Sequence, residues 1–253
     1  MQEPRNEKGQ TLAQFLSAYD ENKYRRPSVT VDMAVFTLIP RAAGWELAVL
    51  LIRRKDHPNI NTWALPGGFI HMDEELNAAA ARELEEETGV CGVPLRPFGS
   101  FGAVNRDPRT RIITCGFFAV APMGSVLPKA GDDAGDAAFF TIDSALEAAS
   151  ASAETYRLTL LGPRLIAARA KLCYDELGPL PGAWAKPGEG GLGGDHDLVL
   201  FAAVRALNAL PRARVARMLA RENPAMISAA RAALNRALGA IPREAHVSMQ
   251  TVR

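Results

Sequence analysis

Residues 68–90 read GFIHMDEELNAAAARELEEETGV and contain both a predicted helix and a cluster of acidic residues. Its second part, from Leu76 to Thr88, is rich in Ala, Leu and Glu, which favour helix, and Gly89 follows as a stop signal. Apolar residues recur along one side of this part, at Leu76, Ala80 and Leu84. The segment therefore predicts a helix that packs on a core through one face.

Three glutamates lie on the other side of this predicted helix. Glu83, Glu86 and Glu87 are spaced i, i+3 and i+4, so they share one helical face. Three like charges on one face repel one another, and a divalent cation bound by their carboxylate oxygens removes that repulsion. A solvated acidic face explains the same spacing, and the spacing alone does not separate the two interpretations.

The residues around the helix favour the metal-binding interpretation, because the whole segment resembles the Nudix box at each of its fixed positions. These positions are a glycine, a glutamate, an Arg-Glu pair, an aliphatic residue, a Glu-Glu pair, a glycine and a second aliphatic residue, here Gly68, Glu74, Arg82, Glu83, Leu84, Glu86, Glu87, Gly89 and Val90. The resemblance to the Nudix hydrolases covers roughly residues 27–142 and extends weakly to 195–207. It implies an α/β fold, the Nudix α/β/α sandwich with a mixed sheet.

The resemblance also implies roles for the residues of the box. Glu83, Glu86 and Glu87 would bind Mg²⁺, or Mn²⁺ in its place, while Glu74 and Arg82 would orient the helix. Gly68 would let the backbone come close to the metal or a phosphate, an approach that a β-carbon would obstruct. The reaction would be attack of water on phosphorus. The general base stays open between a box glutamate and a later acid, for which the sequence offers Asp132, Asp133 and Asp136.

Segments outside the box narrow the substrate. Residues 26–32, 63–69, 106–109 and 195–197 resemble the ADP-ribose pyrophosphatase group, which would split ADP-ribose to AMP and ribose 5-phosphate. Another nucleotide sugar, a dinucleotide polyphosphate or an oxidised nucleotide remains an alternative. The residues that we expect to contact this substrate are Gly67, Gly68, Arg53, Arg106 and Arg109.

Each substrate-binding expectation has a plainer alternative. Arg106 and Arg109 can hold phosphates bidentately, or they can be exposed arginines of a hairpin turn. Trp63 beside a glycine turn is expected in the core rather than stacked on a base. We expect His196, at the start of a helix, to be a cap-region or surface residue rather than a base.

The apolar pattern predicts an α/β core followed by helices. Strands are expected over residues 28–38, 46–52, 93–104, 111–120 and 137–142, and further helices over 11–20, 163–177, 195–210, 212–221 and 224–238. We therefore divide the chain into four parts. These are an N-terminal helical segment (1–26), the Nudix core (27–144), a helical insertion with the C-terminal helix of the core (145–210) and a basic helical tail (211–253).

Composition indicates where in the cell the protein is expected and suggests an alternative function. The chain has 253 residues, three scattered cysteines, a polar N-terminus and no apolar run near the ~18 residues of a membrane helix, so a cytoplasmic protein is expected. Residues 203–253 hold nine arginines and two glutamates. This basic tail favours either packing on an acidic face or DNA binding, as in Nudix-related regulators of NAD metabolism. A homodimer is expected from the resemblance alone.

Overall fold

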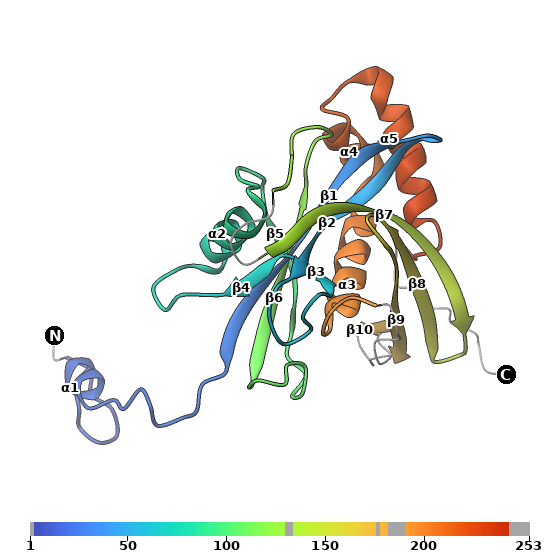
Figure 1. Ribbon diagram of the computed structural model, residues 1–253. Helices are drawn as coiled ribbons and strands as arrows, with labels where there is room; N and C mark the ends of the chain where they lie inside the picture. The colour runs from blue at the N-terminus through green and yellow to red at the C-terminus, as the bar shows by residue number, and fades with distance from the viewer. Residues whose placement is uncertain (1–2, 130–133, 176–177, 182–190, 243–253) are drawn as a thin grey trace.

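The computed structural model describes residues 3–129, 134–175, 178–181 and 191–242 (Figure 1). Asp132 and Asp133, two of the possible general bases, lie outside the described residues. Within the described part, ten strands form one mixed sheet with the path β10-β9-β8-β7-β2-β1-β6-β5, while β3 pairs with β2 and β4 with β1. The strands are β1 (Ser28–Arg41), β2 (Gly44–Arg54), β3 (Trp63–Ala64), β4 (Gly67–Phe69), β5 (Arg96–Phe101), β6 (Ile112–Val120), β7 (Ala134–Ala149), β8 (Ala153–Leu161), β9 (Leu165–Asp175) and β10 (Gly178–Pro181).

Strand β1 lies in the middle of the sheet and shows why the fold is layered. It forms an antiparallel hairpin with β2 and runs parallel to β6. Because side chains alternate along a strand, one set of its apolar residues faces one side of the sheet and the next set faces the other. Each set belongs to a separate buried cluster, the first containing Val31, Met33 and Val35, the second Ala34, Phe36 and Leu38.

Helix α2 (Leu76–Thr88) covers the first face, and its bounds coincide with the predicted helix. Ala80 and Leu84 are buried in the same cluster as Val31 and Met33. The helix ends at Gly89, whose φ of 67° is the left-handed conformation that glycine adopts without strain.

The opposite face is covered by α3 (His196–Ala209), α4 (Arg212–Leu219) and α5 (Pro224–Leu238) (Figure 1). The α/β/α sandwich with a helical C-terminal extension is thereby confirmed. The paired tail helices form as predicted, and α5 packs against β2 and β7. Arg236 also donates to the backbone oxygen of Trp45 at 2.7 Å.

Of the part predicted over residues 145–210, the C-terminal helix is present as α3, but the segment that follows residue 144 is not a helical insertion. Residues Ala153–Leu161 and Leu165–Asp175 form the hairpin β8–β9, so the helix predicted over residues 163–177 is wrong. In β9 every second residue is buried, namely Ile166, Ala168, Ala170 and Leu172. Strand β8 uses the same face, where Tyr156 stacks on Phe201 of α3 at 5.3 Å. Alternating burial against α3 therefore outweighs the helix propensity of the alanines.

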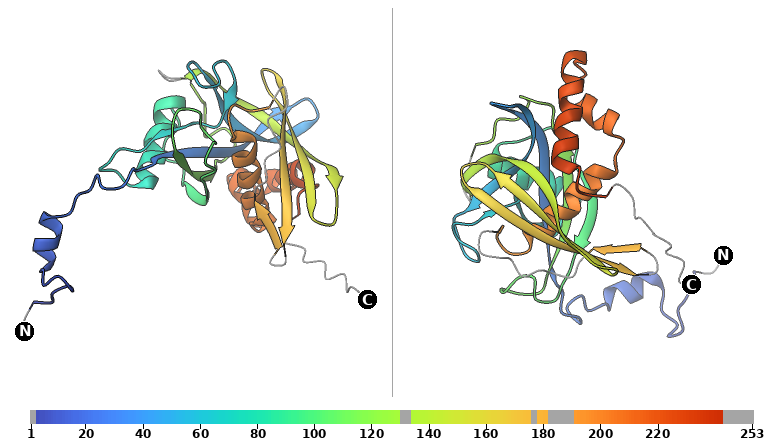
Figure 2. Two further views of the ribbon diagram at one scale, coloured as in Figure 1. Left: turned by 90° about the horizontal axis from the view of Figure 1, so that it is seen from below. Right: turned by 90° about the vertical axis from the view of Figure 1, so that its right-hand side faces the viewer.

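Helix α1 (Leu12–Ser17) has no buried residue and lies away from the sheet at the end of an extended segment (Figures 1 and 2). No helix in the described part of the chain is both long and apolar enough to cross a membrane.

Candidate active site

A cavity of about 480 Å³ opens where α2, β4, the β5–β6 loop and the start of α3 meet. Its wall contains most of the residues expected from the sequence, namely Gly67, Gly68, Glu83, Glu87, Arg106 and Arg109. It also contains Arg54 at the end of β2 and polar residues of the loop that follows, among them Lys55, Asp56 and Asn59. The wall thus brings carboxylates and cations to one cavity.

The two glycines of β4 bring the backbone close to other elements. A β-carbon on Gly67 would lie 2.1 Å from the backbone oxygen of Val31, and one on Gly68 would lie 2.3 Å from Oε2 of Glu83. Real β-carbons do not approach other atoms so closely, so a side chain at Gly67 would meet rigid backbone and one at Gly68 would displace the Glu83 carboxylate. The close approach lets Gly67 donate its backbone N–H to Oε2 of Glu87 at 2.7 Å.

Glu83 and Glu87 lie one helical turn apart and line the cavity. Burial raises the pKa of Glu87 to about 8, and the Gly67 N–H only partly opposes this. Burial also raises the pKa of Glu83, against the lowering effect of Arg82. A cation placed between two desolvated carboxylates would favour their charged forms.

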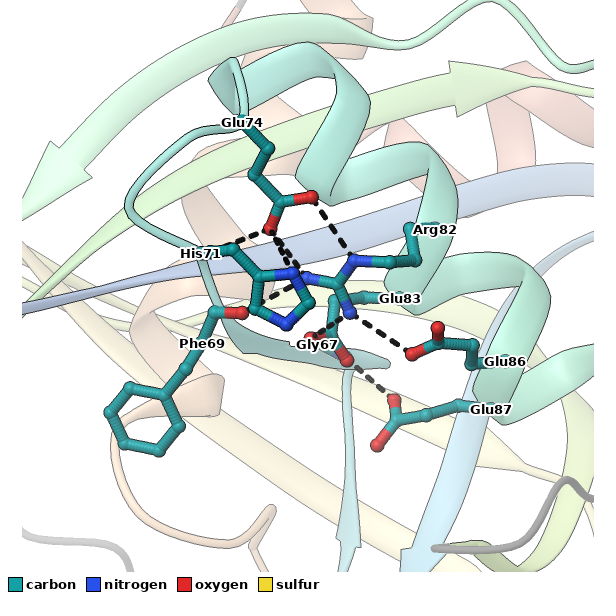
Figure 3. Close-up of polar contacts among 8 residues, drawn as sticks. All are labelled: Gly67, Phe69, His71, Glu74, Arg82, Glu83, Glu86 and Glu87. Atoms are coloured by element: carbon teal, nitrogen blue, oxygen red, sulfur yellow. Dashed lines mark hydrogen bonds and ion pairs between the residues drawn. The ribbon is translucent and has the colours of Figure 1, made fainter.

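Arg82 forms hydrogen bonds with residues before α2 and within it (Figure 3). Its guanidinium donates to both oxygens of Glu74 at 2.6 and 3.1 Å, to Glu83 at 2.8 Å and to Glu86 at 3.0 Å. It also donates to the backbone oxygen of Phe69 at 3.1 Å. Arg82 therefore connects the loop before α2 to the glutamates of the helix, and it holds the pKa of Glu74 at about 2.

Only two of the three glutamates predicted to bind a divalent cation lie at the cavity. Among the described residues, no three His, Cys, Asp or Glu side chains gather as a ready metal site. Glu86 turns towards Arg82 with 58% of its side chain exposed and is not part of the cavity wall. Glu83 and Glu87 remain, and Mg²⁺ is usually held by one or two carboxylates together with substrate phosphates. These two carboxylates fit that requirement.

Arg106 lines the cavity but is already paired. Its guanidinium donates to both carboxylate oxygens of Asp195 at 2.6 and 2.7 Å, and each of the two side chains is only 6% exposed. Asp32 lies 3.7 Å from the same guanidinium and accepts a hydrogen bond from Thr114. Arg106 thus joins the β5–β6 loop to the start of α3, so its donors already have a protein partner.

Of the other predicted residues, only some lie at the cavity wall. Arg109 lies over the ring of Phe69 at 5.3 Å and is bound to Asp107 at the cavity wall. Arg53 and Asp136 pair in register between β2 and β7, and neither lines the cavity. Trp63 is buried edge-on against Phe140, as expected of a core residue.

Sequence reasoning missed Asp32 and Asp195 as members of this site. Both are buried, Asp32 inside the apolar strand VDMAVF. A charged residue in the middle of such a strand is the signal that could have identified it, because a buried carboxylate needs a partner. Asp195 carries no comparable signal, since an aspartate before a helix is common at an N-cap.

Comparison with known proteins gives a family and several relatives. The family model of the NUDIX domain matches residues 31–159, about half of the chain. The chain is 39% identical over 108 residues to an ADPR responsive transcriptional repressor of Acinetobacter baylyi, an alignment that covers 42% of each chain. It is 36% identical over 128 residues to an ADP-ribose pyrophosphatase of Methanocaldococcus jannaschii, covering 49% of this chain and 70% of that one.

A crystal structure of a MutT/nudix family protein from Enterococcus faecalis is similar over most of its length. The TM-score is 0.59 at 25% identity, and the match covers 89% of this chain and 88% of that chain. The similarity includes more than the family domain. By contrast, the chain spans less than half of the length of the repressor.

Proposed function

The chain belongs to the NUDIX domain family, and on that premise we propose that it is a Mg²⁺-dependent pyrophosphohydrolase whose substrate is ADP-ribose. One observation carries the proposal. Glu83 and Glu87 are partly desolvated carboxylates that line one cavity, and the backbone of Gly67 and Gly68 packs directly against them. The products would be AMP and ribose 5-phosphate.

The substrate class follows from the charges of the wall. Arg54, Lys55 and Arg109 bring positive charge to the same cavity as the two carboxylates. Phosphates bridge such groups, because they bind cationic side chains directly and carboxylates through a metal ion. The choice of ADP-ribose is supported by the relative from Methanocaldococcus jannaschii, which is named an ADP-ribose pyrophosphatase.

Separate residues would bind the cation, hold the carboxylates in position and accept the proton. A divalent cation bound by Glu83 and Glu87 would neutralise charge on the phosphates and lower the pKa of attacking water. The Gly67 N–H fixes the position of the Glu87 carboxylate, and Arg82 fixes Glu83. We assign proton acceptance to the glutamates of α2 rather than to Asp136, whose exposed side chain is absent from the cavity wall.

The test measures phosphate release, after a coupling phosphatase, from a panel of nucleoside diphosphate derivatives with Mg²⁺ and with EDTA. Glu87→Gln is compared with Glu85→Gln, which makes the same change at an exposed position of the same helix. We expect turnover of ADP-ribose that disappears in EDTA and falls at least ~100-fold in Glu87→Gln only. Turnover of a different compound would correct the substrate, and a folded protein that hydrolyses nothing in the panel would refute the proposal.

A second function is favoured by the surface of the tail. Arg214 and Arg217 on α4 and Arg221 just after it are exposed and follow one another at i, i+3 and i+7. Such a group of exposed cations suits a polyanion. A nucleic-acid-binding regulator that senses ADP-ribose is therefore the alternative, and the similar protein of Acinetobacter baylyi is named an ADPR responsive transcriptional repressor.

Salt dependence tests this alternative. If α4 contacts DNA phosphates, affinity for duplex DNA will fall steeply as salt rises, and replacing the three arginines with alanine will flatten that slope. If the native chain shows no binding at low salt, the alternative is wrong.

A further inference from the structure

The start of α3, residues 195–197, ties the helix to separate segments of the chain. Asp195 binds Arg106 of the β5–β6 loop, as described above. Asp197 is buried and accepts the backbone N–H of Arg169 in β9 at 3.1 Å. The residue between them, His196, contacts a third segment, residues 65–68, which in turn contacts a carboxylate of α2.

His196 accepts the backbone N–H of Leu65 on Nδ1 at 2.9 Å. Leu65 is 1% exposed, and the His196 side chain is 13% exposed, so water has little access to this hydrogen bond. Leu65 precedes Gly67 by two residues, and Gly67 donates its own N–H to Glu87. A single short path of the chain thus connects the imidazole to the Glu87 carboxylate.

The same contact fixes the tautomer of His196. A ring that accepts on Nδ1 and is neutral carries its proton on Nε2. This Nε2 lies 3.8 Å from Oδ1 of Asp32, and His196 is part of the cavity wall. With Nδ1 accepting from Leu65 and Nε2 already protonated, the ring has no free lone pair to take a proton from water.

We propose that His196 is a positioning residue, not a base: through the Leu65 N–H it holds the segment 65–68, and with it the Gly67 N–H that orients Glu87. The proposal rests on the function proposed above for its kinetic consequences. Its structural content, the link from His196 to Gly67, stands independently of any substrate.

Two substitutions separate the ring nitrogens. In His196→Asn the side-chain oxygen can take the place of Nδ1, whereas in His196→Gln it lies nearer the place of Nε2. We expect His196→Asn to keep kcat for ADP-ribose within about threefold, and His196→Gln to lose about tenfold or more in kcat with little change in KM, as for a misplaced carboxylate. Equal losses in both variants, or a larger loss in His196→Asn, would overturn the proposal.

A measurement without substrate accompanies the kinetics. The backbone amide signals of Leu65 and Gly67 are followed by NMR in the native chain and in both variants. We expect both amides to shift and to exchange faster with solvent in His196→Gln, and to stay near their native values in His196→Asn. If the Gly67 amide is unchanged in His196→Gln, the link is absent, and that result holds whether or not ADP-ribose is the substrate.

Discussion

Replacing Gly68 with alanine should strongly reduce activity while leaving the fold intact. The added β-carbon would lie 2.3 Å from Oε2, 2.4 Å from Cδ and 2.5 Å from Oε1 of Glu83. An ordinary contact begins at 3.4 Å, so the carboxylate would have to move by about 1 Å. It is the free end of a flexible side chain, and it can move without disturbing the backbone.

The expected magnitude follows from this displacement. A catalytic group misplaced by about 1 Å can lose roughly 100-fold in rate, so kcat/KM of Gly68→Ala should fall by about that factor. The free energy of unfolding should change by less than about 1 kcal/mol, as for substitutions that meet no rigid neighbour. The assays are steady-state hydrolysis of ADP-ribose and chemical denaturation of the same preparations.

Two other glycines provide controls. In Gly67→Ala the β-carbon would lie 2.1 Å from the backbone oxygen of Val31, which cannot move without breaking the β1–β4 pairing. That variant should lose stability as well as activity. In Gly99→Ala the nearest atoms lie at 3.8 Å, so neither property should change. The reasoning is refuted if Gly68→Ala keeps native kcat/KM, or if it loses as much stability as Gly67→Ala.

Three further outcomes concern charged residues. Because Arg82 holds the pKa of Glu74 at about 2, below its ordinary 4.5, the ionised carboxylate stabilises the fold above pH 4.5 and this contribution is lost as pH falls towards 2. The free energy of unfolding should therefore differ between the native chain and Glu74→Gln at pH 6, and the difference should shrink at pH 2 to 3. For Glu87 the sign is reversed: a pKa raised from 4.5 to about 8 means that the metal-free fold loses roughly 1.4 kcal/mol per pH unit between these values. Glu87→Gln should lack this loss, and saturating Mg²⁺ should remove it from the native chain; parallel stability curves for the two proteins without metal would contradict the assignment. Arg106→Ala should destabilise by about 3–5 kcal/mol in denaturation, because it leaves Asp195 buried and unpaired. The double change with Asp195→Ala should recover part of that loss, whereas a raised KM at native stability would instead restore Arg106 as a phosphate ligand.

The fold was predictable wherever local pattern and tertiary role agree. Helix α2 has strong helix formers, one apolar side and a glycine stop, and its predicted bounds match the structure. Strand β9 shows the opposite case. Its alanines favour helix, but they are buried at every second residue because β8 pairs with them and α3 covers them. Small side chains conceal such alternation in the sequence, so the partner elements decide the structure.

The candidate site was predictable to a similar extent. The box identified Glu83, Glu87 and Gly68, and the segment before it identified Gly67; the structure brings all four together at one cavity. Its spacing could not show that Arg82 draws Glu86 away from the cavity wall. The pairing of Arg106 with Asp195 joins residues 89 positions apart, and no local pattern in a single sequence reveals such a contact.

Strand β7 has a consequence for anyone who wishes to shorten or tag this protein. Its 16 residues pair with β2 through the first half and with β8 through the second, and Thr141 has a partner on both sides. A chain cut at residue 144, the expected end of the core, would stop within this strand and expose Phe140 and Ile142 beside an unpaired edge. Such edges recruit other chains and aggregate. Affinity tags are best placed on the exposed segment before β1. The core and its β8–β9 hairpin are best expressed as one unit.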